Sequence, residues 1–457
     1  MKSTASMPSP TASKPDLDSI RERDVRHLWH PYTDITTFES QDAYTLIERA
    51  EGVYLYEAGG RPLLDGISSW WCVNLGHGHP RLVEAIQRQA ERLQHCILGG
   101  ISHPGAVELA ERLARLTPGD LNHAFFCGDG ASACEAALKI ALQYWGNVGE
   151  TERTEFICLA DGYHGDTLGA MSVGFVEAFH KPFAAVVKPA HRAPSPHCNR
   201  CPFGKQPESC AIECFDPMEQ LIREHHRRTA AVIVEPLCQG AAGVRIYPDQ
   251  YLRKLRRLCD EYGLLLICDE IAVGFGRTGV MFASERAGIA PDIMTLGKGL
   301  TGGYLPMSTA MVTPRIHDSF RDRDGQTRAF FHGHTFCGNP ITSACALAAL
   351  DVYEEERIIE RLPPRIAQLR EGMTALAATL DGTKVRTLGM IGALELNEQS
   401  GGPARAQEIA RHANQLGLFI RPLGASVYLW PPLVVSEEEL LKMLLLLEKA
   451  IEETQRG

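Results

Sequence analysis

The sequence lacks the features that mark membrane proteins and nucleic-acid binders. No uninterrupted apolar stretch approaches the ~18 residues that a membrane-spanning helix needs, so we expect no membrane partner. Basic residues are not in excess, because the formal net charge at pH 7 is -10. A chain without a basic surface has little to neutralise phosphates, so we expect no nucleic-acid partner. A repeat of about 20–50 residues is also missing, which argues against a solenoid.

The N-terminal region has no apolar core of the kind found in secretory signals. Residues 1–18 are rich in Ser, Thr and Pro, and Asp16 and Asp18 precede the first arginine, Arg21. This composition predicts a loose, disordered tail over residues 1–18 and argues against a secretory signal or a transit peptide. The expected location of the protein is therefore the cytoplasm.

Cysteine is present but not in the pattern of a disulfide scaffold. Most of the 14 cysteines lie in apolar runs, such as Cys158 and Cys268, where a reduced thiol behaves as a small hydrophobic group. Four others follow the spacing C-x2-C-x8-C-x3-C, namely Cys198, Cys201, Cys210 and Cys214. Four thiolates can hold a tetrahedral zinc ion, but the second pair is spaced unusually and nothing around it is typical of a zinc ribbon. We favour reduced loop thiols and expect no metal.

Short apolar runs alternate with helical patterns from about residue 105 to 300. The predicted strands are residues 124–127, 156–160, 230–236 and 264–270, and the predicted helices are residues 133–145 and 251–263. Such alternation predicts an α/β fold with a mostly parallel sheet that is covered by helices on both faces. Ligands of these sheets bind at the carboxyl ends of the strands, so the residues just after each strand are the candidates for a site.

The pattern changes after about residue 340 to longer amphipathic helices and a short set of strands. The last of these helices opens with a capping box from Ser436 to Glu439 and carries leucines at helical spacing. We expect four parts: the tail 1–18, an N-terminal segment 19–75 that packs with the small domain, a large cofactor-binding domain 76–335, and a small C-terminal domain 336–457.

Asp269 stands at the end of the apolar run LLLICDE. Burying a carboxylate there is costly unless a cation meets it. A protonated pyridine nitrogen is such a cation, and keeping it protonated makes pyridoxal phosphate (PLP) an electron sink. The alternative is a structural aspartate that caps the following turn.

Lys298 follows a second apolar run and is flanked by Gly297 and Gly299. Glycines allow other groups to approach the amine closely, and partial burial lowers the pKa of a lysine so that it becomes a nucleophile. The alternative is a lysine that extends from a strand end into solvent. Together with Asp269, the pattern predicts that Lys298 holds PLP as a Schiff base.

A phosphate site is expected where the helix after residue 128 begins. Free backbone N–H groups and the helix dipole favour an anion there, and Gly130, Ala131 and the hydroxyl of Ser132 are the candidate donors. Asp129 would repel the phosphate unless its side chain turns back to cap the helix. Tyr163, in DGYHGDT, offers an aromatic face for the pyridine ring, with a packed core tyrosine as the alternative.

The motifs WHPYT, SSWW, GYHGDT, EPLCQGAAG, DEIAVGFGRTG, LGKGLTGGYLP, HGHTFCGNP and RPLG are distributed between residues 29 and 432. On these motifs the sequence resembles the class III aminotransferases, which belong to fold type I of the PLP-dependent transferases. The resemblance implies a large domain with a mostly parallel sheet flanked by helices, and a smaller α+β C-terminal domain. Asp129 departs from the family, whose members usually have Ser at this position.

The resemblance assigns cofactor-binding roles to matching residues. Lys298 would form the Schiff base and carry a proton between the substrate and the cofactor, and Asp269 would pair with the pyridinium nitrogen. Tyr163 would stack on the ring, and Glu235 would hold the residues around it. The backbone of Gly130 and Ala131 would bind the phosphate.

The resemblance also implies a homodimer with its active sites at the interface, because Thr335 would reach the phosphate in the neighbouring subunit. Arg421 would bind a substrate carboxylate in bidentate fashion, with a surface ion pair as the alternative. The remaining residues expected at the substrate pocket are Tyr32, Trp70, Trp71, Gly333 and Tyr428. Because adjacent residues of an extended segment face opposite ways, we expect only one of the two tryptophans to line the pocket.

Within the class, WHPYT, SSWW and RPLGASVYLWPP are similar to a biotin-pathway subfamily that converts 8-amino-7-oxononanoate into 7,8-diaminononanoate. WHPYT and SSWW favour S-adenosylmethionine as the amino donor, whereas His334 and GYLP resemble members that use lysine. The alternatives are another class III aminotransferase acting on an ω-amino acid, an aminomutase, and a silent PLP-fold binding protein. An intact Lys298 with Asp269 argues against the last of these.

Overall fold

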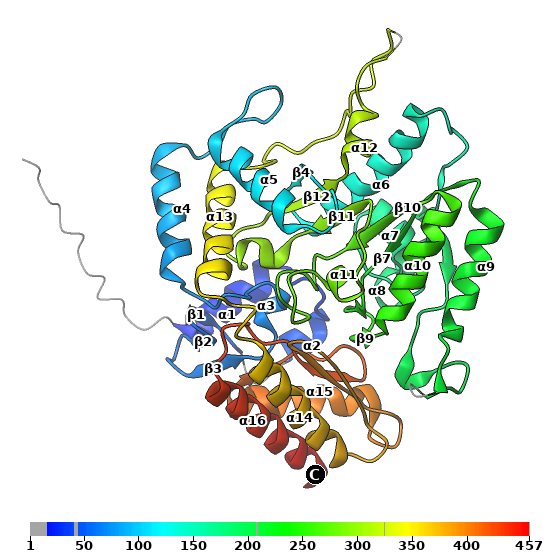
Figure 1. Ribbon diagram of the computed structural model, residues 1–457. Coiled ribbons are helices and arrows are strands. Elements are labelled where there is room, and N and C mark those ends of the chain that lie inside the picture. The colour runs from blue at the N-terminus through cyan, green and yellow to red at the C-terminus, as the bar shows by residue number, and fades with distance from the viewer. Residues whose placement is uncertain (1–15, 41–43, 207–208, 324, 457) are drawn as a thin grey trace, which may run out of the picture.

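A computed structural model describes residues 16–40, 44–206, 209–323 and 325–456. Its centre is a seven-stranded sheet with the strand order β4-β12-β11-β10-β7-β5-β6 (Figure 1). The strands are β4 (His123–Cys127), β5 (Glu155–Leu159), β6 (His191–Ala193), β7 (Thr229–Val234), β10 (Leu265–Asp269), β11 (Ile293–Leu296) and β12 (Ser308–Val312). Only β12 runs antiparallel to its neighbours β11 and β4, so the predicted mostly parallel sheet is confirmed.

The predicted strands and helices of this region are present. The strands predicted at 124–127, 156–160, 230–236 and 264–270 correspond to β4, β5, β7 and β10. The predicted helices 133–145 and 251–263 correspond to α6 (Gly130–Asn147) and α10 (Asp249–Tyr262). All five residues of β10 are buried, which is why this strand appears in the sequence as an unbroken apolar run.

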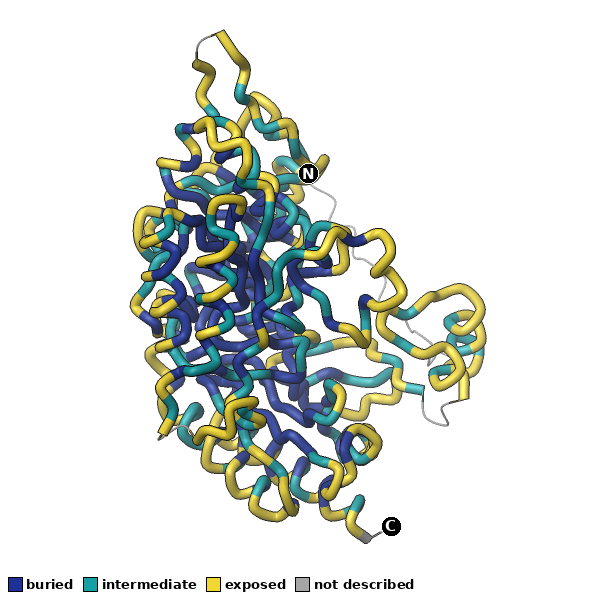
Figure 2. Tube along the Cα trace, turned by 90° about the vertical axis from the view of Figure 1, so that its right-hand side faces the viewer, coloured by how far each residue is buried: buried dark blue, intermediate teal, exposed yellow. Residues whose placement is uncertain are grey.

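Two hydrophobic cores lie on opposite faces of the large sheet. Leu265 and Ile267 of β10 pack in the same cluster as the apolar face of α6, and Leu266 and Cys268 pack in the cluster that contains α10. This alternation follows from the two-residue period of a strand. The sheet therefore lies between helices (Figure 1), and buried residues concentrate along the middle of the molecule (Figure 2).

Helices and short strands connect and cover this sheet. They are α4 (Pro80–Arg92), α5 (Pro104–Leu116), α7 (Leu168–Val173), α8 (Glu177–His180), α9 (Asp216–His225), α11 (Ala283–Arg286), α12 (Pro314–Asp318), α13 (Pro340–Glu355), β8 (Cys238–Gln239) and β9 (Arg245–Ile246). The 3-10 helices are η1 (Lys181–Val186), η2 (Cys198–Arg200), η4 (Glu213–Phe215) and η5 (Lys298–Thr301).

The N-terminal segment joins the C-terminal region through a shared sheet of order β1-β2-β3-β15. Its elements are α1 (Leu17–His27), α2 (Ile35–Glu39), β1 (Ile47–Glu51), β2 (Tyr54–Glu57), β3 (Pro62–Asp65) and α3 (Ser68–Trp71). Strand β15 (Leu418–Phe419) pairs with β3 in parallel, with Leu418 opposite Leu64. Helix α1 begins at Leu17, so residues 17 and 18 are helical and not part of a loose tail; residues 1–15 lie outside the described residues, and the tail expected there stays a prediction.

The C-terminal region has its own antiparallel sheet, β13-β14-β16. Its elements are β13 (Lys384–Leu388), β14 (Ile391–Glu395), β16 (Ser426–Leu429), α14 (Pro363–Ala378), α15 (Gly402–Leu416) and α16 (Glu437–Arg456). The predicted capping box is confirmed, because the backbone N–H of Ser436 donates to Glu439 (2.9 Å) and the Glu439 N–H donates to Ser436 Oγ (3.2 Å). Helix α13 packs on α4 and α5. The division of the chain at residues 18, 75 and 335 stays a prediction.

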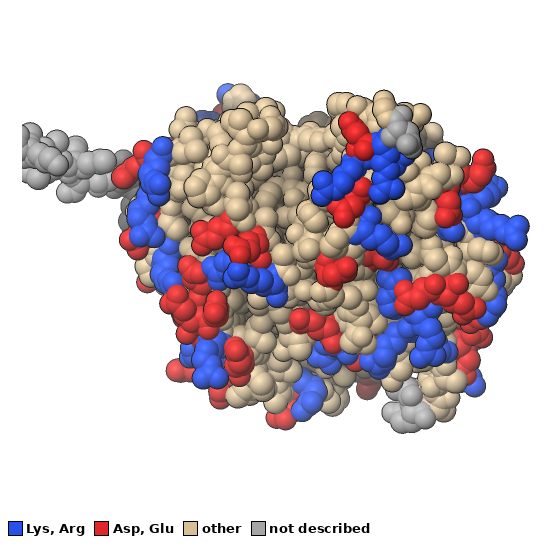
Figure 3. Space-filling view, turned by 45° about the horizontal axis from the view of Figure 1, so that its top comes forward, with Lys and Arg blue, Asp and Glu red and all other residues tan. Residues whose placement is uncertain are grey.

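Charged side chains are mixed on the surface. On the face shown in Figure 3, acidic and basic groups alternate around broad areas without charge. Among the described residues, no helix combines the length and apolar character needed to cross a membrane.

Candidate active site

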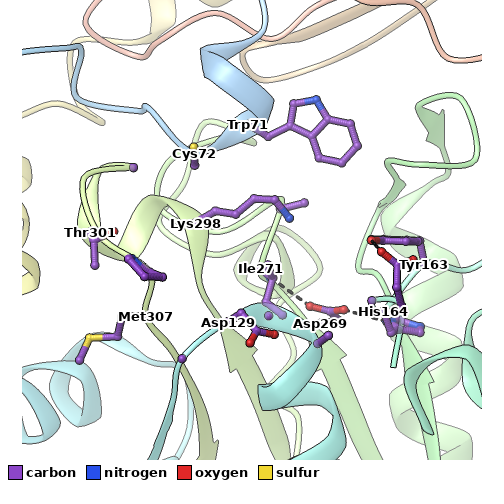
Figure 4. Close-up of a pocket in the computed structure, with 18 of the residues that line it drawn as sticks. Trp71, Cys72, Asp129, Tyr163, His164, Asp269, Ile271, Lys298, Thr301 and Met307 are labelled. Atoms are coloured by element: carbon purple, nitrogen blue, oxygen red, sulfur yellow. Dashed lines mark hydrogen bonds and ion pairs between the residues drawn. The ribbon is translucent and has the colours of Figure 1, made fainter. Parts of the chain in front are cut away.

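A cavity of about 610 Å³ opens at the carboxyl ends of the large sheet's strands (Figure 4). It brings together residues that are far apart in the sequence. The predicted cofactor residues that line it are Lys298, Asp269, Tyr163, Glu235, Gly130 and Ala131, and of the predicted substrate residues Trp71 lines it. The position agrees with the rule that open α/β sheets bind ligands beyond the carboxyl ends of their strands.

Asp269 is the last residue of β10 and is buried. One of its carboxylate oxygens, Oδ1, accepts a hydrogen bond from Thr295 Oγ (2.9 Å) and one from the backbone N–H of Ile271 (3.2 Å). The other, Oδ2, lies 2.7 Å from Nδ1 of the buried His164. Although burial raises the pKa of Asp269, the hydrogen bonds and charge of His164 and the bonds from Ile271 and Thr295 hold it below its ordinary value. Asp269 is therefore ionised at neutral pH.

His164 was not among the predicted site residues. It lies in the GYHGDT motif beside Tyr163, and its ring lines the cavity while it contacts Asp269. The motif contained the residue, but the sequence did not indicate which carboxylate it would meet, since Asp269 lies 105 positions further along the chain.

Lys298 begins the 3-10 helix η5 at the carboxyl end of β11, and its side chain points toward Trp71 (Figure 4). Its Nζ atom lies 5.6 Å from the centre of the Trp71 ring. Burial lowers the pKa of the amine below its ordinary value, while the negative charges of Asp269 and Glu235 oppose that shift. Lys298 has a φ of 43°, a left-handed conformation that is uncommon outside glycine and is enriched at functional sites.

Glu235 and Tyr163 meet at the cavity wall. Glu235 Oε1 accepts a hydrogen bond from the backbone N–H of Tyr163 (3.0 Å), and Oε2 accepts one from Gly240 (2.9 Å). Burial raises the pKa of Glu235 to about 7. The hydroxyl of Tyr163 donates to Asp166 Oδ2 (3.0 Å), which orients the tyrosine ring at the cavity.

The N-terminus of helix α6 lies at the cavity. Its N-cap residue is Asp129, whose carboxylate accepts hydrogen bonds from the backbone N–H and the hydroxyl of Ser132, both at 2.9 Å. The side chain has thus turned back to cap the helix, as the sequence required for a phosphate to be tolerated. Ser132 is engaged by this cap, which leaves the backbone N–H groups of Gly130 and Ala131 as the donors of the first turn.

The SSWW segment is not extended, contrary to the expectation from the sequence. Ser68, Ser69, Trp70 and Trp71 all have positive φ, at 49°, 43°, 74° and 71°. They form one left-handed turn, which costs roughly 1–2 kcal/mol per residue for L-amino acids. Of the two tryptophans, Trp71 is buried and lines the cavity, whereas Trp70 is 43% exposed beside it; their roles toward substrate stay predictions.

Three of the predicted substrate residues meet beside the cavity. The ring of Tyr32 packs edge-on against Trp70 at 5.7 Å. The Arg421 guanidinium lies 5.0 Å from the centre of the Trp70 ring and donates to the backbone carbonyl of Tyr32. The hydroxyl of Tyr32 lies 3.3 Å from that of Tyr163, so this group borders the cavity. Tyr428 is buried behind the wall, where its hydroxyl accepts a hydrogen bond from Trp71 Nε1 (3.2 Å).

Comparison with known proteins identifies the family of this chain. The family model of class III aminotransferases matches residues 36–451. The chain belongs to the class III aminotransferases.

Relatives of this aminotransferase are similar along almost its whole length. An adenosylmethionine-8-amino-7-oxononanoate aminotransferase of Geobacter sulfurreducens is 39% identical over 450 residues, which cover 97% of this chain and 99% of that protein. An enzyme of the same name from Nitratidesulfovibrio vulgaris is 42% identical over 430 residues, or 92% of this chain and 79% of that protein.

Solved structures give the same fold. The adenosylmethionine-8-amino-7-oxononanoate aminotransferase of Methanocaldococcus jannaschii superposes with a TM-score of 0.90 at 35% identity, covering 96% of this chain and 99% of that chain. An (S)-enantioselective omega-transaminase from Thermomicrobium roseum also has a TM-score of 0.90, at 31% identity, covering 97% and 99%. The predicted fold class of this aminotransferase is therefore confirmed.

Two predicted residues of this aminotransferase lie outside the cavity of their own chain. Gly333 and Thr335 belong to an exposed segment after β12. The aromatic residues that flank them are also exposed, Phe331 by 85% and Phe336 by 64%. The roles given to Gly333 and Thr335 stay predictions.

The cysteine cluster lies apart from the active site. Cys198, Cys201, Cys210 and Cys214 line a second cavity of about 530 Å³, and all cysteines of the chain are free thiols. Among the described residues, potential metal ligands lie within 4.8 Å of one another at Cys134–His164–Asp269 and at Glu155–His191–His225, and the four loop cysteines form no such group. The preference for reduced thiols stays a prediction.

Proposed function

We propose that this aminotransferase uses PLP to transfer an amino group to 8-amino-7-oxononanoate and so produces 7,8-diaminononanoate for biotin biosynthesis. The observation that carries the chemistry is the presence in one cavity of a desolvated lysine amine, Lys298, and a buried ionised carboxylate, Asp269. The substrate follows from the near full-length similarity to enzymes named for that reaction.

The cavity fits the cofactor. Asp269 is a buried anion whose contacts in the described part of the chain leave lone pairs on its oxygens, and these can accept an N–H from a pyridinium ring. The first turn of α6 supplies backbone N–H groups for a phosphate, with Gly130 and Ala131 at the cavity. Bound PLP supplies an electron-withdrawing ring that accepts the charge released when a substrate C–H bond breaks.

Lys298 is the proposed acid and base. Burial lowers the pKa of its amine and so favours the neutral form, in which Nζ can take a proton from the substrate Cα. The same nitrogen then returns the proton. The indole of Trp71, 5.6 Å from Nζ, excludes water from this face of the amine.

The remaining cavity residues hold the cofactor in place. We propose that Tyr163 stacks on the ring, because its hydroxyl and its backbone are fixed by Asp166 and Glu235. Glu235 in turn binds the N–H of Gly240, so it joins two loops that border the cavity. Asp269 keeps the ring nitrogen protonated.

The group of Tyr32, Trp70 and Arg421 is proposed to receive the acceptor substrate. Arg421 donates to a neutral carbonyl in the described structure, so its charge is available to a substrate carboxylate. Trp71 lines the pocket, and Tyr428 holds the Trp71 indole through its hydroxyl.

The assembly is proposed to be a homodimer in the cytoplasm. Phe331 and Phe336 expose large apolar rings on either side of Gly333 and Thr335, and covering such rings with a second copy is favourable. Thr335 would then contact the phosphate in the neighbouring subunit, with Gly333 at its substrate pocket. The free thiols of the chain suit a reducing compartment.

A donor panel tests the proposed function. The purified enzyme is incubated with 8-amino-7-oxononanoate and, separately, S-adenosylmethionine, lysine, alanine or glutamate, and 7,8-diaminononanoate is measured. We expect S-adenosylmethionine to support turnover. Lysine is the second candidate because of His334 and GYLP. Rearrangement of 8-amino-7-oxononanoate without any donor, and without formation of the diamine, would indicate an aminomutase. Activity confined to the deamination of ω-amino acids would contradict the proposed substrate.

A further inference from the structure

Arg277 is a fully buried cation whose hydrogen bonds all go to neutral oxygens. It follows β10 in the GFGRTG motif and is 0% exposed. Its Nη1 donates to the backbone carbonyls of Pro431 (2.7 Å) and Met390 (3.2 Å). Its Nη2 donates to Asn74 Oδ1 (2.8 Å) and Ser68 Oγ (3.3 Å). In the described part of the chain no carboxylate bonds to this guanidinium, although the charge of Asp65 acts on it, and such a buried cation requires a reason.

One of these acceptors, Ser68, is the first residue of the left-handed turn. The turn is held from its other side by Asp65, whose carboxylate accepts from the backbone N–H (2.9 Å) and the hydroxyl (2.7 Å) of Ser69. The Ser68 hydroxyl donates to the Trp430 carbonyl (2.6 Å). A strained backbone persists only where its surroundings over-determine it, and here Asp65 and Arg277 provide that constraint from two sides.

The turn sets the position of the Trp71 indole. The ring stacks on Trp430 at 4.9 Å with an interplanar angle of 21°, and the Arg277 guanidinium lies 5.5 Å from the Trp430 ring. The indole also lies against Gly240, where an added Cβ would lie 3.0 Å from the ring. Trp71 is therefore clamped, with its ring centre 5.6 Å from the Lys298 amine.

We infer that Arg277 is a positioning residue for the reaction: by binding Ser68, Asn74 and Pro431 together it keeps the turn left-handed and holds the Trp71 indole over Lys298. This rests on the proposed function of the cavity. Arg277 touches no cavity atom itself and acts through the turn. Only a guanidinium has enough N–H groups in a fixed plane to reach four acceptors from three segments, so lysine cannot replace it fully.

The test compares Arg277→Lys and Arg277→Met with a matched control, Arg386→Lys. Arg386 is also a buried arginine, with its side chain 4% exposed, but it pairs with Glu395 in the C-terminal region and does not line the active-site cavity. In the cofactor-free protein, hydrogen–deuterium exchange of the peptide spanning residues 67–74 is measured. We expect exchange about fivefold faster or more in both Arg277 variants, and no change in the control.

In the PLP-loaded enzyme, the pH midpoint of the visible absorbance and the kinetic constants are measured. Loosening Trp71 admits water to Lys298, so the Arg277 variants should show a midpoint raised by about half a unit or more. We expect kcat to fall by about tenfold or more while the KM for the acceptor changes less. Lysine should rescue part of the loss seen with methionine, because it restores part of the donor set.

Ser68→Ala keeps the inference testable if the Arg277 variants do not fold. It removes one acceptor of Arg277 and should produce the same changes to a smaller extent. Unchanged exchange and an unchanged absorbance midpoint in variants that fold would refute the positioning role. Failure of the wild-type enzyme to form a borohydride-fixable PLP adduct would instead refute the proposed function.

Discussion

Two buried glutamates, Glu235 at the cavity and Glu395 in the C-terminal region, have pKa values shifted in opposite directions by their surroundings. Glu235, at the active-site cavity, is 6% exposed and accepts hydrogen bonds from the backbone N–H groups of Tyr163 and Gly240. Burial raises its pKa to about 7. Glu395, in the C-terminal sheet, is 8% exposed, so both residues are buried.

The surroundings of Glu395 compensate its charge fully. It lies 2.6 Å from Arg386, 2.7 Å from Arg200 and 3.2 Å from His197. Although burial raises the pKa of Glu395, these three groups lower it to about 2. We call this set the arginine junction, since it joins the loop after β6 to strands β13 and β14.

The difference separates a structural site from a reactive one. In the arginine junction the carboxylate of Glu395 pairs with both arginines, and its pKa is shifted away from neutrality. In the cavity Glu235 and Lys298 are both desolvated, and their pKa values are shifted toward neutrality. Groups held in this way are poised to exchange protons and to bind a cofactor.

The largest expected effect is the loss of all aminotransferase activity on changing Lys298 to Ala. The amine is the only group proposed to bind PLP covalently and to move the substrate proton. Borohydride reduction followed by mass spectrometry should find PLP on residue 298 of the wild type and none in the variant. A retained adduct in Lys298→Ala would contradict the assignment.

The control comes from the arginine junction. Arg386→Met should lower the free energy of unfolding by roughly 3 kcal/mol because it breaks a buried ion pair, while the rate of transamination stays within a few-fold of the wild type.

Asp269→Asn should come next, with kcat reduced by about 10²–10³-fold. Asparagine keeps the size of the side chain but removes the charge that pairs with the ring nitrogen, while His164 and Thr295 remain in place. Single-turnover absorbance of the half-reaction with the amino donor measures the effect. A fall of less than about threefold would show that Asp269 is structural, like Glu395.

The pH dependence of stability should have opposite signs in the two regions. The pKa of Glu235 in the folded protein is raised from 4.5 to about 7. Its contribution to the free energy of unfolding is therefore fully present below pH 4.5 and is lost as the pH rises through 7. The pKa of Glu395 in the folded protein is lowered from 4.5 to about 2. Its contribution to the free energy of unfolding is therefore present above pH 4.5 and is lost as the pH falls through 2. Each shift corresponds to roughly 3 kcal/mol.

Urea unfolding of the cofactor-free protein at several pH values tests the two opposite pH dependences predicted for Glu235 and Glu395. Glu235→Gln should flatten the decline in unfolding free energy between pH 5 and 8, whereas Glu395→Gln should leave that decline unchanged and lower the stability at all values above pH 5. The comparison uses the slope of unfolding free energy against pH. A hydrogen bond that the glutamine amide fails to make lowers the stability equally at every pH and does not change this slope. Equal slopes in wild type and Glu235→Gln would contradict the raised pKa.

The smallest effect is expected for Arg421→Ala, with the KM for 8-amino-7-oxononanoate raised about 10–100-fold. Arg421 is only half-buried, so its contribution is weaker than that of a fully buried ion pair. The kinetic constants for the amino donor should change by less than the KM for the acceptor. The opposite pattern would place the acceptor carboxylate elsewhere.

Four of the seven strands of the large sheet, β4, β5, β7 and β10, and the position of the site at the carboxyl ends of the strands could be predicted, because a buried parallel strand has a distinctive composition. Lys298, Asp269, Glu235 and Tyr163 each come after such a run, and the shared direction of the strands brought them to one edge. His164 was missed because its partner is set by the order of strands in the sheet, which the local pattern does not contain.

The SSWW turn was predicted wrongly as extended for a related reason. Its left-handed conformation depends on Asp65, Arg277 and the backbone of residues 430 and 431, and two of these contacts come from distant parts of the chain. Local propensity opposes such a turn. Likewise, the roles of Gly333 and Thr335 depend on a second copy of the chain and remain predictions.

The contact between Trp71 and Tyr428 spans 357 residues of sequence, and it has a consequence for biosynthesis. A ribosome delivers the N-terminal residues first, so a nascent chain that has emerged through residue 400 already contains both Lys298 and Asp269. Trp71 still lacks Tyr428 and Trp430 at that stage, and β3 lacks its partner β15. The wall beside the reactive amine therefore forms only after residue 430 has been synthesised, so Lys298 and Asp269 are made before the cavity that holds them can be completed.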